Sequence, residues 1–419
     1  MSIQARLYSV FAFLVLLVIG LGIFGFARLS DVNHASEAIR DHWLRDTRIL
    51  GDLSNYMSDY RAAEATRLLA STPQEFTASE QEIAKLGATV TASERAYEET
   101  QSKFAVKGGR LISRVNGRSW SIGEFEMAPL AKVRRRAAAV GAASGKPSLR
   151  IVQGDVRKMH AAPEYGGALF QVASQFNALE MVGPDVVPED GVTDYAYDHT
   201  QGPACALAAA PAMVYRNYFA PVGDGVGQTR DRQLDGLADI GAALSAALGR
   251  PTSDLWQMRN GYALCNRSSL EAISAHLSTL DDDARDALRG RLSIAIQRSV
   301  EVTEPGAPAG QFVSQAYCSA LPVRYGGGPA RLWAPFATLV LEAAYEATLL
   351  EAAASAARGG SNIVLLTMLG GGVFGNEREW IFAAIRRALT IAAFDLDVRI
   401  VSFGSISPDL KAFVKTAGR

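Results

Sequence analysis

The sequence predicts a three-layer α/β domain with a mixed sheet between helices on both faces, preceded by a transmembrane helix and a helical hairpin. Two observations point to the α/β domain. Asn362–Met368 is an apolar, partly β-branched run of the length of a buried strand, and helical spacing of apolar residues begins after Glu377. Over the last hundred residues such helices and strands alternate, and right-handed crossovers would place these strands in one parallel sheet. A charge-free apolar run near the N-terminus predicts the membrane helix.

Length and composition allow two or three ordinary globular domains. The chain has 419 residues, 48% of them hydrophobic and 20% charged, with a net charge of -1. Without a basic excess, we expect no nucleic-acid partner. The three cysteines, Cys205, Cys265 and Cys318, lie far apart and form no C-x-x-C pair, so we expect neither a disulfide framework nor a zinc site. They are interpreted as small buried hydrophobes, with a nucleophilic thiol as the alternative.

An acidic loop follows residue 188 and is a candidate metal site. Asp190, Asp194 and Asp198 could bind a divalent cation, but their spacing is not that of an EF-hand and the five histidines are dispersed. A surface loop is the favoured interpretation, so we expect no metal and no cofactor.

The first segment, Leu7–Ala27, has no charged residue and is flanked by Arg6 and Arg28. About 20 residues of helix span about 30 Å of hydrocarbon, so this segment predicts a single-pass anchor in the inner (plasma) membrane. A cleaved signal peptide is the alternative, but the apolar run is long and no A-x-A site follows. Counting the flanking arginines favours a cytoplasmic position for the rest of the chain.

Residues 29–104 show helical spacing interrupted at Ser71–Glu75, which predicts a helical hairpin. With the anchor, this segment resembles the first half of the four-helix sensory domain of methyl-accepting chemoreceptors. No further bundle helices, second span or signalling rod follow Phe104. The apolar stripe of two helices should therefore pair with a second copy of the chain, giving a homodimer, or pack on the following domain.

The α/β domain is assigned to residues 105–419, with a helical insertion at 230–292. Asn116-Gly117 predicts a hairpin with a type I′ turn. The short helix after Pro129 carries basic residues that predict a solvated face. The remaining elements are the strands Leu149–Val152, Ala168–Ala173, Leu292–Val302, Gln311–Val323, Asn362–Met368 and Val398–Phe403, and the helices Ser174–Glu180 (the opening of a helix), Thr200–Tyr218, Leu332–Arg358 and the last helix up to Phe394.

A glycine loop between the strand Asn362–Met368 and the next helix is the candidate binding site. Gly370, Gly371, Gly372 and Gly375 let backbone N–H groups turn towards one point, and the helix N-terminus adds its positive end, as in a phosphate cradle. The loop matches neither G-x-G-x-x-G nor a Walker A motif, which disfavours a dinucleotide-binding dehydrogenase and a P-loop NTPase. A tight turn without a ligand is the alternative.

This loop resembles the second phosphate-binding loop of macrodomains and of their poly(ADP-ribose) glycohydrolase-like relatives, with a Gly-x-Phe-Gly step. The resemblance implies that Gly372, Val373, Phe374, Gly375 and Asn376 contact the diphosphate of an ADP-ribose-type ligand.

Two other stretches resemble the same family in the expected order. Gly154-Asp155-Val156 is similar to the macrodomain step whose Asp contacts the adenine amino group, although a strand-end turn explains it equally well. The helix start at Gly202 corresponds in order to the first macrodomain loop, and its N-terminus is expected to be free for an anion.

The sequence departs from the family where catalysis is concerned. Gln171 and Ser174 replace the family's asparagines, and only Glu180 or Asp198 could serve as an acid, Glu180 being interpreted as a solvated helix residue. Three functions stay open: a membrane-anchored module binding ADP-ribose or a related nucleotide, an ADP-ribosyl glycohydrolase, and a chemoreceptor-type fragment acting through its bundle.

Overall fold

The computed structural model describes residues 94–140 and 145–418, and these belong to a compact unit that runs from Ala92 to Arg419. The predicted membrane helix at 7–27 and the greater part of the helical hairpin at 29–104 lie outside the described residues. Within the described ranges, no helix is both long and apolar enough to cross a bilayer. Residues 94–102 are helical and lead directly into the first strand.

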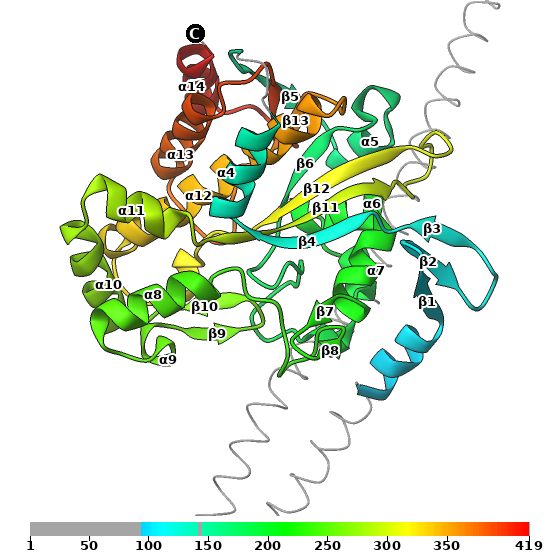
Figure 1. Cartoon of the computed structure of the whole chain (residues 1–419), viewed down its shortest axis with the longest axis horizontal. Helices are drawn as coiled ribbons and strands as arrows, with labels where there is room; N and C mark the ends of the chain where they lie inside the picture. The colour runs from blue at the N-terminus through cyan, green and yellow to red at the C-terminus, as the bar shows by residue number, and fades with distance from the viewer. Residues whose placement is uncertain (1–93, 141–144, 419) are drawn as a thin grey trace, which may run out of the picture. The chain divides into compact units, whose positions relative to one another are not determined.

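A seven-stranded mixed sheet forms the centre of this unit, in the order β4-β11-β12-β6-β13-β14-β5 (Figure 1). The pairs β4/β11 and β11/β12 are antiparallel, whereas the strands from β12 to β5 run parallel. The predicted mixed sheet is therefore confirmed. Its strands are β4 (Glu124–Pro129), β5 (Ser148–Gln153), β6 (Leu169–Ala173), β11 (Ser293–Glu301), β12 (Phe312–Cys318), β13 (Ile363–Leu366) and β14 (Asp397–Ser402).

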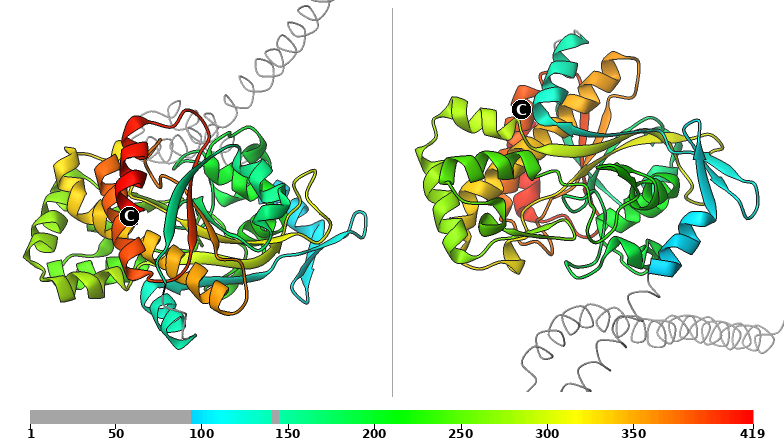
Figure 2. Two further views of the ribbon diagram at one scale, coloured as in Figure 1. Left: turned by 90° about the horizontal axis from the view of Figure 1, so that it is seen from above. Right: turned by 60° about the horizontal axis from the view of Figure 1, so that its bottom comes forward.

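Helices cover both faces of the sheet, as Figures 1 and 2 show. Alternate residues of β13 point into different cores: Val364 and Leu366 join the larger core and Leu365 joins the smaller one. The larger core holds α4 (Leu130–Ala139), α12 (Ala330–Ala357), α13 (Arg378–Ile391) and α14 (Pro408–Ala417). The smaller core holds α5 (Val156–Ala161), α6 (Gln201–Ala208) and α7 (Ala210–Tyr218).

The insertion at 230–292 packs beside α12 and contributes to the larger core. Besides the expected helices it contains a hairpin whose turn is Asn260-Gly261, where both residues have positive φ (46° and 78°) as a type I′ turn requires. No hairpin is predicted from the sequence at this second Asn-Gly pair. The insertion comprises α8 (Ala238–Leu248), α9 (Thr252–Leu255), β9 (Gln257–Arg259), β10 (Tyr262–Leu264), α10 (Arg267–Thr279) and α11 (Asp282–Arg289).

The predicted type I′ turn at Asn116-Gly117 is wrong. Only Gly117 has a positive φ, and Ser113 pairs with Arg118 across a four-residue loop. The strands on either side belong to a small separate sheet of β1 (Phe104–Lys107), β2 (Arg110–Ser113) and β3 (Ser119–Ser121). Two further short strands, β7 (Pro221–Val222) and β8 (Gly225–Val226), form a hairpin of their own.

Two helix predictions also need correction. Residues 174–180 form no helix, because Asn177 and Gln175 use their side chains to bond the nearby backbone N–H groups of Leu179 and Met181. The predicted helix Thr200–Tyr218 is two helices, α6 and α7. They separate at Ala209 (φ -123°, ψ 54°), two residues before Pro211, which has no N–H to continue the helical ladder.

The basic face of α4 is not simply solvated, contrary to the prediction. Arg134 bonds Glu346 and Asp286, and Arg136 bonds Glu126 and lies 3.4 Å from Glu351. The two acids on α12 are 1% exposed, so the arginines of α4 compensate charges that would otherwise be buried alone.

Candidate functional site

Two of the predicted motifs follow parallel strands at the carboxyl edge of the sheet, where α/β proteins bind ligands. Gly154 and Asp155 follow β5, and the glycine loop follows β13. Between these two strands lies β14, so the two motifs flank its end. The structure therefore brings the two main motifs to one edge.

The glycine loop is closed by bonds within itself. Asn376 N–H donates to the Gly370 carbonyl at 2.9 Å, and Gly375 N–H donates to the Gly372 carbonyl at 3.2 Å. Gly370 and Gly375 have positive φ (70° and 75°), and a Cβ on Gly370 would lie 2.5 Å from that of Ala320. Gly372 differs, because a Cβ there would meet nothing within 4 Å. The loop needs its first and last glycines for its shape.

Three consecutive amides at the tip of the loop have no acceptor. Among the described residues, the N–H groups of Gly372, Val373 and Phe374 donate to no protein group. Gly372 is exposed, and the Val373 side chain is 56% exposed. Successive unpaired amides of this kind form a concavity suited to an anion.

A positive charge that sequence reasoning missed lies at the same tip. Arg324, which follows β12, donates from its backbone N–H to the Phe374 carbonyl at 3.0 Å and from Nη1 to the Gly372 carbonyl at 3.3 Å. It lies 48 residues from Gly372, so only tertiary structure reveals the contact. The free amides and this guanidinium offer donors and charge to a diphosphate.

Asn376 is buried at 4% exposure and fastens the loop to its neighbour. Its Nδ2 donates to the Leu321 carbonyl at 2.8 Å, whereas its Oδ1 is buried with no hydrogen-bond partner in the described structure. The predicted helix after the loop is present as α13, which begins at Arg378 and has no side-chain cap. Exposed Glu377 and Glu379 flank that helix start, so the loop amides and Arg324 are the stronger anion donors.

Phe374 turns towards an aromatic group. Its ring centroid lies 5.2 Å from that of Tyr262 and 5.9 Å from that of Tyr325, and Tyr262 and Tyr325 are 5.5 Å apart. Tyr262 belongs to the insertion hairpin, so the insertion supports the glycine loop directly. Sequence reasoning assigned no motif to the insertion and missed this contact.

Asp155 caps the helix after β5. Its Oδ1 accepts the Arg157 N–H at 2.9 Å, and its other carboxylate oxygen accepts no hydrogen bond from a described residue. Gly154 N–H pairs with the Ser402 carbonyl at 3.0 Å, which joins this turn to the end of β14. This arrangement fits both interpretations of the Gly-Asp step. Asp155 is a turn and cap residue, and one of its carboxylate oxygens has no partner within the described part of the chain and could accept from a ligand.

Phe403, immediately after β14, is a second residue that sequence reasoning missed. It is 78% exposed, and the turn at Gly154 is hydrogen-bonded to its neighbour Ser402. An exposed aromatic ring between the Asp155 turn and the glycine loop offers a face on which a base could stack. The sequence signal that could have identified Phe403 as a site residue is its position at the end of a predicted strand.

Gly202 is not a free anion-binding position. It is buried, and a Cβ there would collide with the Ala173 carbonyl oxygen and lie 3.1 Å from Cγ of Glu180. The neighbouring Gln201 side chain accepts from Ala173 N–H and donates to the Gln171 carbonyl, both at 2.8 Å. Gly202 therefore serves the close packing of α6 on the end of β6.

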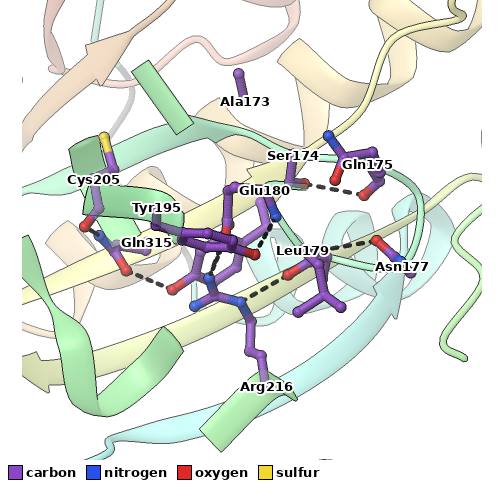
Figure 3. A network of polar contacts seen from close by, with 12 residues as sticks. Ala173, Ser174, Gln175, Asn177, Leu179, Glu180, Tyr195, Cys205, Arg216 and Gln315 are labelled. Atoms are coloured by element: carbon purple, nitrogen blue, oxygen red, sulfur yellow. Dashed lines mark hydrogen bonds and ion pairs between the residues drawn. The ribbon is translucent and has the colours of Figure 1, made fainter. Parts of the chain in front are cut away.

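Glu180 is buried, not solvated as predicted, and is paired with an arginine (Figure 3). Arg216 Nη2 lies 2.8 and 2.9 Å from the two carboxylate oxygens, and both side chains are 0% exposed. Arg216 Nε donates to the Ala178 carbonyl, and its guanidinium lies 3.6 Å from the ring centroid of Tyr317. Burial raises the pKa of Glu180 to about 7, against the opposing effect of Arg216.

A buried polar chain continues from this pair. The Tyr317 hydroxyl donates to Gln315 Oε1 at 2.5 Å, and Gln315 Nε2 lies 3.0 Å from His160 Nε2. His160 Nδ1 lies 2.7 Å from the Val156 carbonyl, so the proton is assigned to Nδ1 and the ring is neutral. Burial lowers the pKa of His160 to about 4.

Asp198 is engaged as well, and the described residues hold no cluster of metal ligands. Asp198 Oδ1 accepts the Thr200 N–H at 2.8 Å before α6. No group of three or more His, Cys, Asp or Glu side chains suited to a metal occurs in residues 94–140 and 145–418. The prediction of buried cysteines is confirmed, since all three are free and buried and burial raises each thiol pKa.

A small cavity lies beneath the same edge and is lined by Gln175, Phe176, Tyr317 and other side chains. Its volume of about 10 Å³ corresponds to one water molecule. It is too small for a nucleotide.

Residues 1–103 match a family model described as a four helix bundle sensory module for signal transduction. This match confirms the resemblance predicted for the first quarter of the chain. No curated protein matches the sequence.

Among solved structures, poly(ADP-ribose) glycohydrolase from Thermomonospora curvata is 13% identical, with a TM-score of 0.36 over 78% of this chain and 99% of that one. The ADP-ribose complex of poly(ADP-ribose) glycohydrolase from Deinococcus radiodurans is 11% identical, with a TM-score of 0.34 over 70% and 92% of the two chains. The predicted resemblance of the α/β domain to poly(ADP-ribose) glycohydrolase-like proteins thus corresponds to a distant structural likeness. The support for a function comes from the residues of the site.

Proposed function

We propose that residues 105–419 bind ADP-ribose or a related nucleotide at the carboxyl edge of the sheet. The observation that carries the proposal is the row of unpaired amides at Gly372, Val373 and Phe374, beside the Arg324 guanidinium. A diphosphate would accept from these amides and be partly neutralised by the arginine. The carboxyl edge of a parallel sheet is also the usual place for such a ligand.

The base of the nucleotide would lie towards β14 and β5. Asp155 has one carboxylate oxygen available to accept from an exocyclic amino group, and Phe403 offers an exposed ring for stacking. Phe403 follows β14, which is next to β13, and Asp155 follows β5, the strand beyond β14, so one extended ligand could reach them and the glycine loop. This arrangement favours a nucleotide over a simple phosphate.

Binding is favoured over hydrolysis in this proposal. The Glu180 carboxylate is 0% exposed and held by Arg216, and one oxygen of Asp198 accepts the Thr200 N–H just before α6. A general acid must reach the atom that it protonates, and the Glu180 carboxylate cannot do this in the described arrangement because it is enclosed and held by Arg216. We therefore propose a binding module and expect no turnover of ADP-ribosylated substrates.

The test is calorimetry of the full-length protein with ADP-ribose. Gly372→Glu should abolish the binding heat, because the added charge repels the diphosphate, whereas Gly372→Ala should retain it, because its Cβ meets nothing within 4 Å. Asp155→Ala should weaken binding by about 1 to 3 kcal/mol if its carboxylate pairs with the base. Phe403→Ala should weaken it by about 1 to 3 kcal/mol through lost stacking.

Thermal melting of each variant separates a binding defect from unfolding. A bound ligand at a hundredfold excess over Kd adds roughly 2.7 kcal/mol of stability to the wild type. If the wild type gives neither heat nor thermal shift with ADP-ribose, NAD or poly(ADP-ribose) at millimolar concentration, the proposed function is wrong.

We also propose that Leu7–Ala27 anchors the chain in the inner membrane, with residues 105–419 in the cytoplasm. Its charge-free length supports this proposal. Full-length protein should stay with membranes after a carbonate wash, and recovery of a soluble, N-terminally shortened protein would reject the anchor. An impermeant thiol reagent should label Cys265 only after lysis and unfolding.

We propose a homodimer through the hairpin at 29–104, which alone supplies half of a four-helix bundle. Ultracentrifugation of a fragment containing residues 29–104 should give a dimer. A helical monomer at high concentration would contradict this proposal.

A further inference from the structure

The helix at residues 94–102 lies at the end of the segment that matches the sensory module, yet it packs on the α/β unit. Tyr97 is 6% exposed, and its ring centroid lies 4.7 Å from that of Tyr218. Gly227 leaves room for it, because a Cβ there would lie 2.5 Å from the Tyr97 hydroxyl. In Figure 1 this helix precedes β1 and runs beside α7 and the hairpin of β7 and β8.

Two side chains of this helix bond the end of α7. The Tyr97 hydroxyl donates to the Asn217 carbonyl at 2.9 Å, and Gln101 Nε2 donates to the Tyr218 carbonyl at 2.6 Å. The last carbonyls of a helix lack partners within the helix, so these donors complete its C-terminus. The position of α7 therefore depends in part on the helix at 94–102.

The same end of α7 holds the loop that follows β6 (Figure 3). Arg216 precedes the two bonded residues and binds Glu180 and the Ala178 carbonyl. Gln228 adds a second connection, since its Nε2 donates to the carbonyls of Arg216 and Asn177 at 3.0 Å. Its backbone N–H shares the Asn217 carbonyl with Tyr97.

The loop after β6 then reaches the glycine loop. The Tyr262 hydroxyl donates to the Met181 carbonyl at 3.0 Å and lies 3.3 Å from Gln175 Nε2. The Tyr262 ring packs on Phe374, one of the residues with an unpaired amide. An unbroken series of buried contacts thus connects Tyr97 with the proposed diphosphate site.

We propose that this series couples the N-terminal sensory module to ligand binding, with Tyr97 and Gln101 as positioning residues for the loop 174–181 and the glycine loop. A change in the sensory helices would move the helix at 94–102, shift the end of α7 and alter the glycine loop through Tyr262. Close-packed interiors transmit such displacements. The coupling rests on the proposed function for its ligand, and linkage requires that ADP-ribose in turn affect the helix at 94–102.

The first experiment is hydrogen exchange on the full-length protein without ligand. Tyr97→Phe removes only the hydroxyl and should raise exchange at the Gln175, Leu179 and Met181 amides by about two- to tenfold, the range for one lost hydrogen bond. Tyr97→Ala should raise it further. The exposed neighbour Glu98 provides the control, and Glu98→Gln should leave exchange unchanged.

Strand β13 serves as an internal reference against global unfolding. The amides of Val364 and Leu365 should exchange equally in the wild type and Tyr97→Phe. If the amides of residues 174–181 exchange in Tyr97→Phe as they do in Glu98→Gln, no coupling exists and the proposal is overturned.

The second experiment is a double-mutant cycle on ADP-ribose affinity in the full-length protein, with Tyr97→Phe and Tyr262→Phe. Substitutions at independent, distant sites have additive effects on the binding free energy, so the Kd of the double variant then agrees within about twofold with the value expected from the two single variants. A larger departure from that expected Kd supports the coupling, and agreement within about twofold overturns it. If the wild type binds no ADP-ribose, the proposed function fails, and the exchange experiment still decides whether the contacts are coupled.

Discussion

Two loops at neighbouring strand ends differ in how completely their polar groups are paired. The loop after β6 buries Glu180 against Arg216, and the backbone N–H groups of Gln175, Leu179, Glu180 and Met181 all find acceptors. The glycine loop after β13 leaves three amides unpaired and exposes its tip. Both occupy the edge where a ligand is expected, yet of these two loops it is the second that has a row of unpaired amides at an exposed tip.

This difference separates a supporting loop, at residues 174–181, from the glycine loop that is proposed to bind the ligand and is called the binding loop here. Unpaired backbone groups are tolerated at an exposed tip because water or a ligand can satisfy them. A buried carboxylate has no such freedom, since it is stable there only with its partner. The acidic residue at this edge is therefore explained by structure, and the unpaired amides are the groups on which the proposed binding rests.

The largest expected effect concerns the supporting loop. Arg216→Met leaves Glu180 buried without its partner and should lower the free energy of unfolding by about 3 to 5 kcal/mol in urea titrations of the full-length protein. Adding Glu180→Leu should recover much of this loss, because the uncompensated charge is gone. Gly372→Ala in the binding loop should change stability by at most about 0.5 kcal/mol. Equal stability of Arg216→Met and wild type would remove the distinction between the two loops.

A pH dependence follows from His160, which belongs to the same buried chain. Its pKa is lowered from 6.5 to about 4 on folding, so its contribution to stability is present above about pH 6.5 and lost as pH falls towards 4. The total loss is about 3 kcal/mol. Comparing wild type with His160→Gln across this range isolates the histidine from Glu180. The Glu180 pKa is raised to about 7, so its contribution has the opposite sign and declines as pH rises from about 4.5 to 7.

Parallel stability curves for wild type and His160→Gln between pH 4 and 7 would show that this imidazole is not neutral and buried. The control is His199, which is exposed. Comparing His199→Gln with the wild type over the same pH range tests whether replacing any histidine has this effect.

The smallest effect concerns the binding loop. Arg324→Gln should weaken ADP-ribose binding by about 1.5 kcal/mol, the lower end for a charge-assisted hydrogen bond, and should reduce the salt dependence of Kd. Arg324→Lys, which keeps the charge, should retain most of that salt dependence. An unchanged Kd and salt slope in Arg324→Gln would place the anion elsewhere.

Local patterns determined the parts of the site that lie within one stretch of chain. The run Asn362–Met368 and the glycines after it predicted β13 and its loop, because the signals for a buried strand and for a glycine turn both depend on adjacent residues. The Gly-Asp step after a strand and the four-helix sensory segment were likewise readable from neighbouring residues.

Contacts between distant residues were decided only by the tertiary structure. Nothing near Glu180 shows that Arg216 lies 36 residues further on and buries it, and nothing near Gly372 reveals Arg324. Residues 174–180 have a helical sequence pattern but form a loop, because their side chains bond nearby backbone N–H groups. Burial and pairing depend on which elements the fold brings together, whereas strands, turns and caps depend mainly on residues a few positions apart.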